Sequence, residues 1–340
     1  MSQVHYSEYL QLDKILGAQE PESDRAGKPA HDEMLFIVVH QAYELWFKQI
    51  LFEVNSVTEI LSKPVNDNSP ELQTIVHRLS RCVTILKLLV HQIDIMETMT
   101  PMDFLDFRDM LRPASGFQSW QFKILEARLG LKYEARHGKD YYISQLKPHE
   151  VEMIRDMEQK PSLLELVNAW LERMPFTDEA ATGNGLVAVP GFWSNYREIY
   201  AATLQEGERN NLKYFDKVFL GEGEGQENRS LSPKACKSAL FIMLYRGYPI
   251  LQLPFQLLNN LLELDEQLST WRYRHMNMVQ RMIGTRVGTG GSTGRDYLKA
   301  ALDKHYIFSE IAQLTSFLIE RNKLPQLPKD VERQLGFDLK

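Results

Sequence analysis

The feature that most constrains the fold is a helical repeat of apolar residues that runs from residue 253 to residue 282. The apolar positions recur mostly at intervals of three and four, which places them on one face of a helix of about thirty residues. Gly284 ends the pattern, and a glycine-rich loop at residues 288–294 follows it. No segment alternates with a period of two for long enough to predict a strand. The sequence therefore predicts an all-α protein with one large helical bundle.

Further helical patterns occupy most of the chain. A short amphipathic helix is predicted at residues 6–16, and a polar stretch at 18–30 follows it. Asp32 is the predicted N-cap of the next helix, and Thr100 with Pro101 opens a short helix that carries Arg108. The other predicted helices cover residues 32–61, 69–99, 117–129, 149–158, 162–174, 192–219, 232–245, 296–302 and 306–318. Irregular segments are predicted at 130–148, 175–191 and 221–232.

Composition and charge narrow the class of protein. The chain has 340 residues, is 44% hydrophobic and carries a formal net charge of −6. Its basic residues are spread along the sequence, which argues against a nucleic-acid or membrane-surface partner. The two cysteines, Cys82 and Cys236, lie far apart within helical patterns, as expected in a reducing compartment. The first residues have no basic and apolar leader pattern, and no apolar run approaches eighteen residues, so we expect a cytoplasmic protein.

His275 lies on the apolar face of the long helix, one turn after Trp271. A buried neutral imidazole beside an aromatic ring is suited to be the axial ligand of a flat metal cofactor such as haem. The same pattern also fits a core histidine that is hydrogen-bonded to a carbonyl. The residues alone leave both interpretations open.

A second histidine, His40, shares a helix face with Phe36, Tyr43 and Phe47. This pattern again fits either a histidine in a binding pocket or a core histidine with a satisfied imidazole. Arg108 lies between aromatic residues on the short helix. A guanidinium among apolar neighbours needs an anion, which is either a structural carboxylate or the carboxylate of a substrate.

The glycine-rich loop at 288–294 offers backbone N–H groups and hydroxyls to a bound anion or zwitterion. It lacks the lysine and the preceding strand of a phosphate-binding P-loop. At the other end of the chain, the apolar residues of 6–16 form an arm on a polar tether. Such an arm docks on its own chain or on a neighbouring subunit, and the pattern does not decide between them.

Several long strings resemble the tryptophan 2,3-dioxygenase family. They are HDEMLFIVVHQAYELWFKQI at 31–50, IMETMTPMDFLDFRDMLRPASGFQSWQF at 95–122, PFQLL at 254–258, WRYRHMNMVQRMIG at 271–284 and GTGGSTG at 288–294. The resemblance extends from the N-terminal YSEYLQLDKIL to about residue 318. It implies a helical, homotetrameric enzyme with one haem b per subunit in the core of the bundle. Such an enzyme opens the indole ring of L-tryptophan with O₂ and gives N-formylkynurenine, the first step of tryptophan catabolism.

The resemblance also implies roles for single residues. His275 corresponds to the iron ligand, and His40 to the catalytic histidine that accepts a hydrogen bond from the indole N–H. Arg108 corresponds to the arginine that binds the substrate carboxylate, and Thr289 to the threonine that binds the amino-acid end. The other positions are Phe36, Phe104, Ser115, Tyr9 and Leu10 in the substrate pocket, Tyr6 from a neighbouring subunit, and Gly116 and Trp271 beside the haem.

The resemblance divides the chain into an arm at 1–17 and a helical haem dioxygenase domain at 31–320. Residues 175–232 match the family poorly, so we expect a variable helical insert there. Thr293 stands where the family commonly has serine, which keeps the hydroxyl. Two other functions compete with tryptophan cleavage. One is another oxidation of an aromatic amino acid on the same fold, and the other is a haem or tryptophan sensor without turnover.

Overall fold

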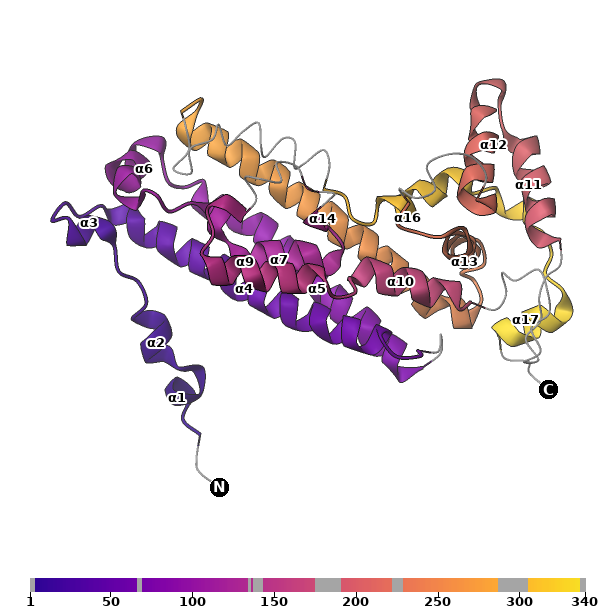
Figure 1. Ribbon diagram of the computed structural model, residues 1–340, viewed down its shortest axis with the longest axis horizontal. Helices are drawn as coiled ribbons and strands as arrows, with labels where there is room; N and C mark the ends of the chain where they lie inside the picture. Colours follow the sequence, from indigo (N-terminus) through magenta and orange to yellow (C-terminus); the bar gives the residue numbers. More distant parts are fainter. Residues whose placement is uncertain are drawn as a thin grey trace.

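Three long helices form the centre of the protein. The computed structural model of the chain describes residues 4–65, 69–133, 136, 143–174, 191–221, 229–286 and 305–336. Within these residues α4 (His31–Leu61), α5 (Pro70–Met96) and α14 (Gln252–Ile283) run along the long axis of the molecule (Figure 1). Helix α5 packs against both α4 and α14. The described residues contain helices and no strand, so the predicted all-α fold is confirmed.

Helix α14 confirms the long helical repeat that dominates the sequence. Its buried face includes Leu257, Leu261, Leu264 and Leu268, all at 1% exposure or less. The helix ends where Gly284 adopts φ +60°, a conformation that L residues with a side chain rarely take. The predicted end of the helix is therefore confirmed.

A second layer of helices lies beside α4. In it α7 (Trp120–Leu129) and α10 (Leu163–Glu172) pack on α4, and α9 (Pro148–Glu158) packs on α7. Ser162 begins α10 with a capping box, in which its hydroxyl accepts from the Glu165 N–H and its own N–H donates to the Glu165 carboxylate. At the end of α7, Gly130 has φ +141°, and a Cβ at this position would lie 2.9 Å from Cβ of Leu164. This glycine lets α7 and α10 approach closely.

Shorter helices form the far end of the molecule (Figure 1), and aromatic side chains from several of them pack together. These helices are α11 (Phe192–Thr203), α12 (Asn210–Phe215), the π-helix η6 (Asp216–Leu220), α13 (Pro233–Leu244), α16 (Ser309–Gln313) and η9 (Leu314–Phe317). The buried hydroxyl of Tyr196 donates to the carbonyl of Phe317 at 2.7 Å. The 3₁₀ turns η5 (Glu206–Glu208), η8 (Pro249–Leu251) and η10 (Arg321–Lys323) and helix α17 (Lys329–Leu335) complete this end.

The prediction of one helix over 192–219 is wrong. Leu204 leaves the helical conformation at φ −74°, ψ 133°, and Gln205 starts a new turn through a capping box with Glu208. The helix predicted at 306–318 is also shorter, because it is divided into α16 and η9. The helix predicted at 296–302 lies outside the described residues.

The N-terminal region differs from its prediction in three details. The single helix expected at 6–16 is broken into α1 (Tyr6–Leu10) and α2 (Leu12–Leu16), because Gln11 takes φ +53°. The polar stretch after it contains a short helix, α3 (Glu22–Arg25). The predicted cap is wrong, because Ala30 is the N-cap of α4. Asp32 lies within the first turn, where its negative charge interacts favourably with the helix dipole.

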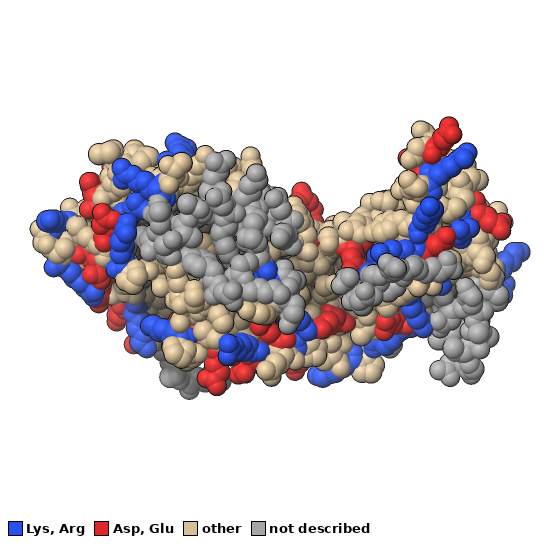
Figure 2. Space-filling model, turned by 45° about the horizontal axis from the view of Figure 1, so that its top comes forward, with Lys and Arg blue, Asp and Glu red and all other residues tan. Residues whose placement is uncertain are grey.

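The short helix between α5 and α7 forms as predicted. Helix α6 (Pro101–Arg108) begins with a capping box between Thr100 and Asp103, and the 3₁₀ turn η1 (Asp109–Leu111) continues it. A second 3₁₀ turn, η2 (Gly116–Gln118), precedes α7, so the helix expected from residue 117 begins at Trp120. On the face shown in Figure 2, basic and acidic side chains are interspersed over the coloured residues. None of the described helices is both long and apolar enough to span a membrane.

Candidate active site

The ring of His275 stacks on the ring of Trp271 on α14. The two planes are parallel within 4°, and the ring centroids are 5.1 Å apart. Trp271 is fixed in turn by rings from three neighbours, with centroid distances of 5.1 Å to Phe122, 6.0 Å to Tyr43 and 6.3 Å to Phe47. These contacts restrict the rotamers of Trp271 and thereby the orientation of the imidazole.

The imidazole of His275 is suited to bind a metal. Burial, followed by repulsion from a charge on His40, lowers its pKa to about 4. The ring is therefore neutral at physiological pH and keeps a lone pair for a metal. Its Nδ1 atom is buried and has no hydrogen-bond partner among the described residues. A core histidine normally has such a partner, so this orphaned nitrogen favours the ligand interpretation.

His40 presents a hydrogen-bond acceptor to the site. Its Nδ1 lies 2.7 Å from the carbonyl oxygen of Phe36, one turn earlier on α4. Because a carbonyl only accepts, Nδ1 must donate, and the neutral ring then has an unprotonated Nε2. Burial lowers the pKa of His40, although its side chain keeps a solvent-accessible surface. Such a combination is typical of a side chain in a concave site.

Aromatic rings from two elements line the wall beside His40. Phe36 on α4 and Phe104 on α6 stack with centroids 5.7 Å apart, and both pack on the fully buried Phe107. The ring of Phe36 also lies 4.1 Å from that of His40. These rings belong to an apolar cluster that is separate from the main core and includes the buried Met282 near the end of α14. The structure therefore brings Phe36, His40 and Phe104 together, as the sequence predicts.

Arg108 ends α6 directly after Phe107 and is 4% exposed. A buried guanidinium is stabilised by an anionic partner. The neighbouring Phe107 places Arg108 at the end of the bundle that carries Phe36 and His40.

Ser115 and Gly116 lie at the turn that leads into α7. The hydroxyl of Ser115 accepts from the N–H of Phe117 at 3.3 Å, and its N–H donates to Gln118 at 3.2 Å. Gly116 has no positive φ, and a Cβ added to it would meet no atom within 4 Å. Neither the backbone conformation nor the packing of this chain explains the glycine.

The structure does not bring every predicted residue to this site. Tyr6 and Tyr9 are 72% and 74% exposed, Leu10 is half-buried, and Figure 1 shows α1 and α2 away from the bundle. Within a single chain these residues do not line the pocket. Thr289 and Thr293 lie outside the described residues. No group of three or more metal-binding side chains occurs among the described residues.

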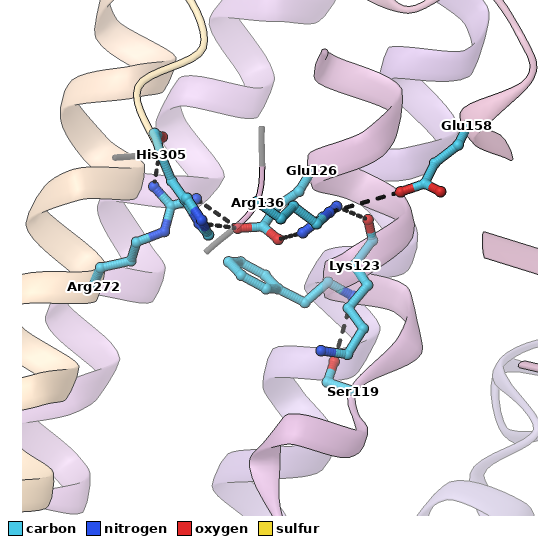
Figure 3. Close-up of polar contacts among 8 residues, drawn as sticks. Ser119, Lys123, Glu126, Arg136, Glu158, Arg272 and His305 are labelled. Carbon is cyan, nitrogen blue, oxygen red and sulfur yellow. Dashed lines mark hydrogen bonds and ion pairs between the residues drawn. The ribbon is translucent and has the colours of Figure 1, made fainter. Parts of the chain in front are cut away.

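The sequence reasoning missed a buried ionic network between α7 and α14, drawn in Figure 3. The carboxylate of Glu126 lies 2.5 Å from Nη1 of Arg136 and 2.7 Å from Nη2 of Arg272. Burial alone would raise the pKa of Glu126, but Arg136, His305 and Arg272 hold it well below its usual value. Arg272 also donates to the carbonyl oxygen of His305 at 3.1 Å. The network thus joins α7 to the helix that carries His275.

The neighbourhood of this network carries further buried charge. Lys123, one turn before Glu126 on α7, has its pKa lowered to about 8 by burial. Asp265 on α14 accepts from the N–H groups of Ile307 and Phe308 at 3.0 and 2.5 Å. These bonds hold the chain after residue 304 against α14. Polar residues inside otherwise apolar helix faces, such as Arg272 and Asp265, were the only local signal of this arrangement.

Comparison with known proteins identifies the family. The family model described as tryptophan 2,3-dioxygenase matches residues 1–219 and 222–318. The chain belongs to the tryptophan 2,3-dioxygenase family. The match includes nearly all of the segment 175–232, and the expected variability of this segment stays a prediction.

Similar proteins from distant organisms carry the same name. The tryptophan 2,3-dioxygenase of Bdellovibrio bacteriovorus is 44% identical, and the match covers 98% of each chain. That of Alteromonas mediterranea is 43% identical with the same coverage. The Dictyostelium discoideum protein is 42% identical over 98% of this chain and 88% of its own length. The family resemblance of the sequence motifs therefore extends over the whole chain.

Proposed function

We propose that this member of the tryptophan 2,3-dioxygenase family is a haem enzyme that cleaves the indole 2,3 bond of L-tryptophan with O₂. The product is N-formylkynurenine, which contains both oxygen atoms. The observation that carries the proposal is the pair of neutral histidines. His275 is a lone-pair donor stacked on Trp271, and His40 is an acceptor oriented by its hydrogen bond to Phe36.

The residues of the site fit a haem b. His275 would hold the iron, Trp271 would fix the ring of His275, and the open space at Gly116 would take an edge of the porphyrin. When bound, such a haem would supply an iron that activates O₂. We assign one haem to each chain, because each chain supplies one proposed iron ligand, His275.

The remaining residues would bind and orient tryptophan. Phe36 and Phe104 provide flat apolar surface for the indole, and Nε2 of His40 accepts its N–H. Arg108 would pair with the carboxylate, and the hydroxyl of Thr289 with the amino-acid end. Ser115 is assigned to the same pocket. Because N-formylkynurenine is tryptophan plus O₂, the reaction removes no proton overall, and a hydrogen bond from the indole to His40 suffices.

These contacts also account for selectivity among aromatic amino acids. A phenylalanine side chain has no N–H, so it would leave the acceptor of His40 without a partner from the substrate. Tyrosine would place a hydroxyl against apolar rings instead. The unpaired acceptor Nε2 of His40 therefore favours the indole over the other aromatic side chains.

We also propose a homotetramer in the cytoplasm. The exposed apolar side chains of the N-terminal arm need a partner, and a neighbouring copy of the chain would receive Tyr6, Tyr9 and Leu10 in its pocket. The two cysteines, Cys82 and Cys236, are buried free thiols, as expected in a reducing compartment.

The test combines a spectrum with product analysis. The purified protein should show a Soret band that shifts when tryptophan is added, and mass analysis should find a product that is heavier than tryptophan by two oxygen atoms. A Soret band without such a product would leave a haem protein with a different activity. Absence of a Soret band after reconstitution with haem would overturn the proposal.

A further inference from the structure

The N-terminal arm, residues 4–17, has exposed apolar side chains. The segment that connects it to α4, residues 18–30, is held in place and is called the root of the arm. Tyr6, Tyr9 and Leu16 are 72%, 74% and 72% exposed, and Figure 1 shows the arm projecting from one end of the bundle. The chain between the arm and α4 is anchored at three places. Each anchor lies next to a residue that we assign to the substrate pocket.

The first anchor is Glu33 in the first turn of α4. Its side chain is only 1% exposed, and its two carboxylate oxygens accept the N–H groups of Glu22 and Ser23 at 2.8 and 2.9 Å. A carboxylate in this position satisfies orphan donors at the start of α3. The hydroxyl of Ser23, which is fully buried, accepts from the N–H of Ala30 at 3.0 Å and closes the turn. Glu33 precedes Phe36 by one helical turn.

The second anchor is Gln41, the residue after His40. Its amide nitrogen donates to the carbonyl oxygen of Ala18 at 3.0 Å, and its amide oxygen accepts from Nε2 of Gln19 at 2.7 Å. Both hydrogen-bonding groups of one side chain therefore hold the root of the arm. A bidentate amide fixes a direction as well as a position, because rotation of the arm about its root would break one of the two bonds.

The third anchor is a packing contact. Helix α3 packs against η1, the turn that begins directly after Arg108. The root of the arm is thus held by α4 and by the continuation of α6, the elements that carry Phe36, His40 and Arg108. A flexible tether would let the arm fold back on its own chain, whereas these contacts hold it away from the bundle.

The outer face of α4 continues the apolar surface of the arm. Met34, Val38, Leu45 and Phe52 recur at intervals of four and seven residues and are 44%, 45%, 54% and 72% exposed. Gln41 lies on the same face of the helix. An apolar stripe next to an apolar arm is continuous with the surface that the proposed oligomer would cover. A second copy of the chain, which carries the same stripe and arm, is the occupant that fits both.

We propose that Glu33 and Gln41 are positioning residues that direct the arm of each subunit into the tryptophan pocket of a neighbouring copy of the chain. The inference rests on the proposed function, because it assumes that the neighbouring pocket binds tryptophan. The new element is that Glu33 and Gln41 set the orientation of the arm. Without the anchors, the arm would have to be ordered during docking, which would weaken its contribution to the pocket.

The first experiment compares three full-length holoenzyme variants. Gln41→Leu removes both hydrogen bonds of the side-chain amide, and Glu33→Gln removes one of the two hydrogen-bond acceptors. Gln49→Leu is the matched control. Gln49 lies two turns after Gln41 on α4, and its amide donates to Glu53 rather than to the arm. We expect the KM for tryptophan to rise about tenfold in the two anchor variants, which corresponds to about 1.4 kcal/mol. The kcat and the haem content should match those of Gln49→Leu.

A readout without turnover accompanies the kinetics. Trypsin should cleave after Lys14, which is exposed in the single chain, faster in the anchor variants than in the control. A docked arm protects this bond, and a misdirected arm does not. This measurement tests the anchors even if the wild-type protein forms no N-formylkynurenine, so failure of the proposed function is distinguished from failure of the anchoring.

The second experiment tests whether the anchors act between subunits. A Gln41→Leu chain has an intact pocket and a misdirected arm, whereas an Arg108→Leu chain has a damaged pocket and an intact arm. The two chains are co-expressed with different affinity tags, and mixed oligomers are purified through both tags. At low tryptophan concentration the mixed oligomers should turn over faster than the average of the two pure oligomers, because intact arms reach intact pockets.

Two results would overturn the inference. If the anchor variants have the same KM and the same cleavage rate after Lys14 as Gln49→Leu, the anchors do not direct the arm. If their KM rises but mixed oligomers show no gain, the anchors act on the pocket of their own subunit through His40.

Discussion

The Nδ1 atom of His40 lies 2.7 Å from the carbonyl oxygen of Phe36, which leaves Nε2 of the neutral ring as an acceptor. This relationship sets the role of His40. His40→Ala should lower kcat/KM for tryptophan by about tenfold, because one hydrogen bond to the indole is lost, without abolishing turnover. Oxygen uptake with tryptophan measures the effect. A fall to the level of free haem would show that His40 is an essential base.

The same histidine predicts a pH dependence. Burial lowers the pKa of His40 below its usual 6.5, so the acceptor is present at neutral pH and is lost only as the pH falls below 6.5. In His40→Gln the amide oxygen can accept but does not titrate. The loss of kcat/KM between pH 6.5 and 5 should therefore be smaller in this variant than in the wild type. Identical acid limbs would assign the titration to another group.

His275→Ala should lose most of its bound haem, because the imidazole on α14 is the proposed iron ligand. Haem per subunit, from the pyridine haemochrome spectrum, is the measurement. His91→Ala is a suitable control, since its side chain is 77% exposed on α5. Full haem content with a normal ferrous spectrum in His275→Ala would remove it as the ligand.

Arg108→Leu should weaken tryptophan binding by about 2–5 kcal/mol, because the substrate carboxylate would lose its partner in a buried site. Tryptamine, which has no carboxylate, should bind equally to the variant and the wild type. Arg112→Leu, with a side chain that is 53% exposed, controls for loss of positive charge nearby. Equal losses for tryptophan and tryptamine would make Arg108 a structural residue.

Asp265→Asn should change how stability depends on pH. Burial raises the pKa of Asp265 from 3.8 to about 6, so its folded form prefers the proton. Its favourable contribution is complete below pH 3.8 and is lost as the pH rises through 6, a loss of about 3 kcal/mol. The stability of the variant relative to the wild type, from urea unfolding, should therefore increase between pH 4 and pH 7. A constant difference would contradict the assignment.

Removal of residues 1–17 should weaken tryptophan affinity and loosen the oligomer while haem stays bound. Light scattering and tryptophan titration are the measurements. The truncation leaves Glu33, Gln41 and α14 in place, so the bundle itself should be unaffected. A truncated protein with unchanged mass and affinity would show that the arm contributes to neither.

Local sequence was sufficient for much of the fold. The spacing of apolar residues predicts α4, α5 and α14, and Thr100, Ser162 and Gly284 mark helix ends that the structure confirms. These features depend on neighbours within a turn or two, which a single sequence displays. Phe36, His40 and Phe104 were predicted as one site because their motifs resemble a known family, and the structure brings them together.

Only the tertiary structure decided which distant groups meet. Glu126 pairs with Arg272, which is 146 positions later in the sequence. Gln41 on α4 donates a hydrogen bond to the carbonyl of Ala18, which lies outside that helix. The break at Leu204 and the αL residue Gln11 also escaped prediction, since a regular apolar pattern does not reveal where packing favours a turn. A helix pattern specifies which face is buried, but the partner of a buried charge depends on how whole helices pack. The sequence by itself therefore determined the long helices and the family, and the packing determined the breaks in the shorter helices, the ionic network and the direction of the arm.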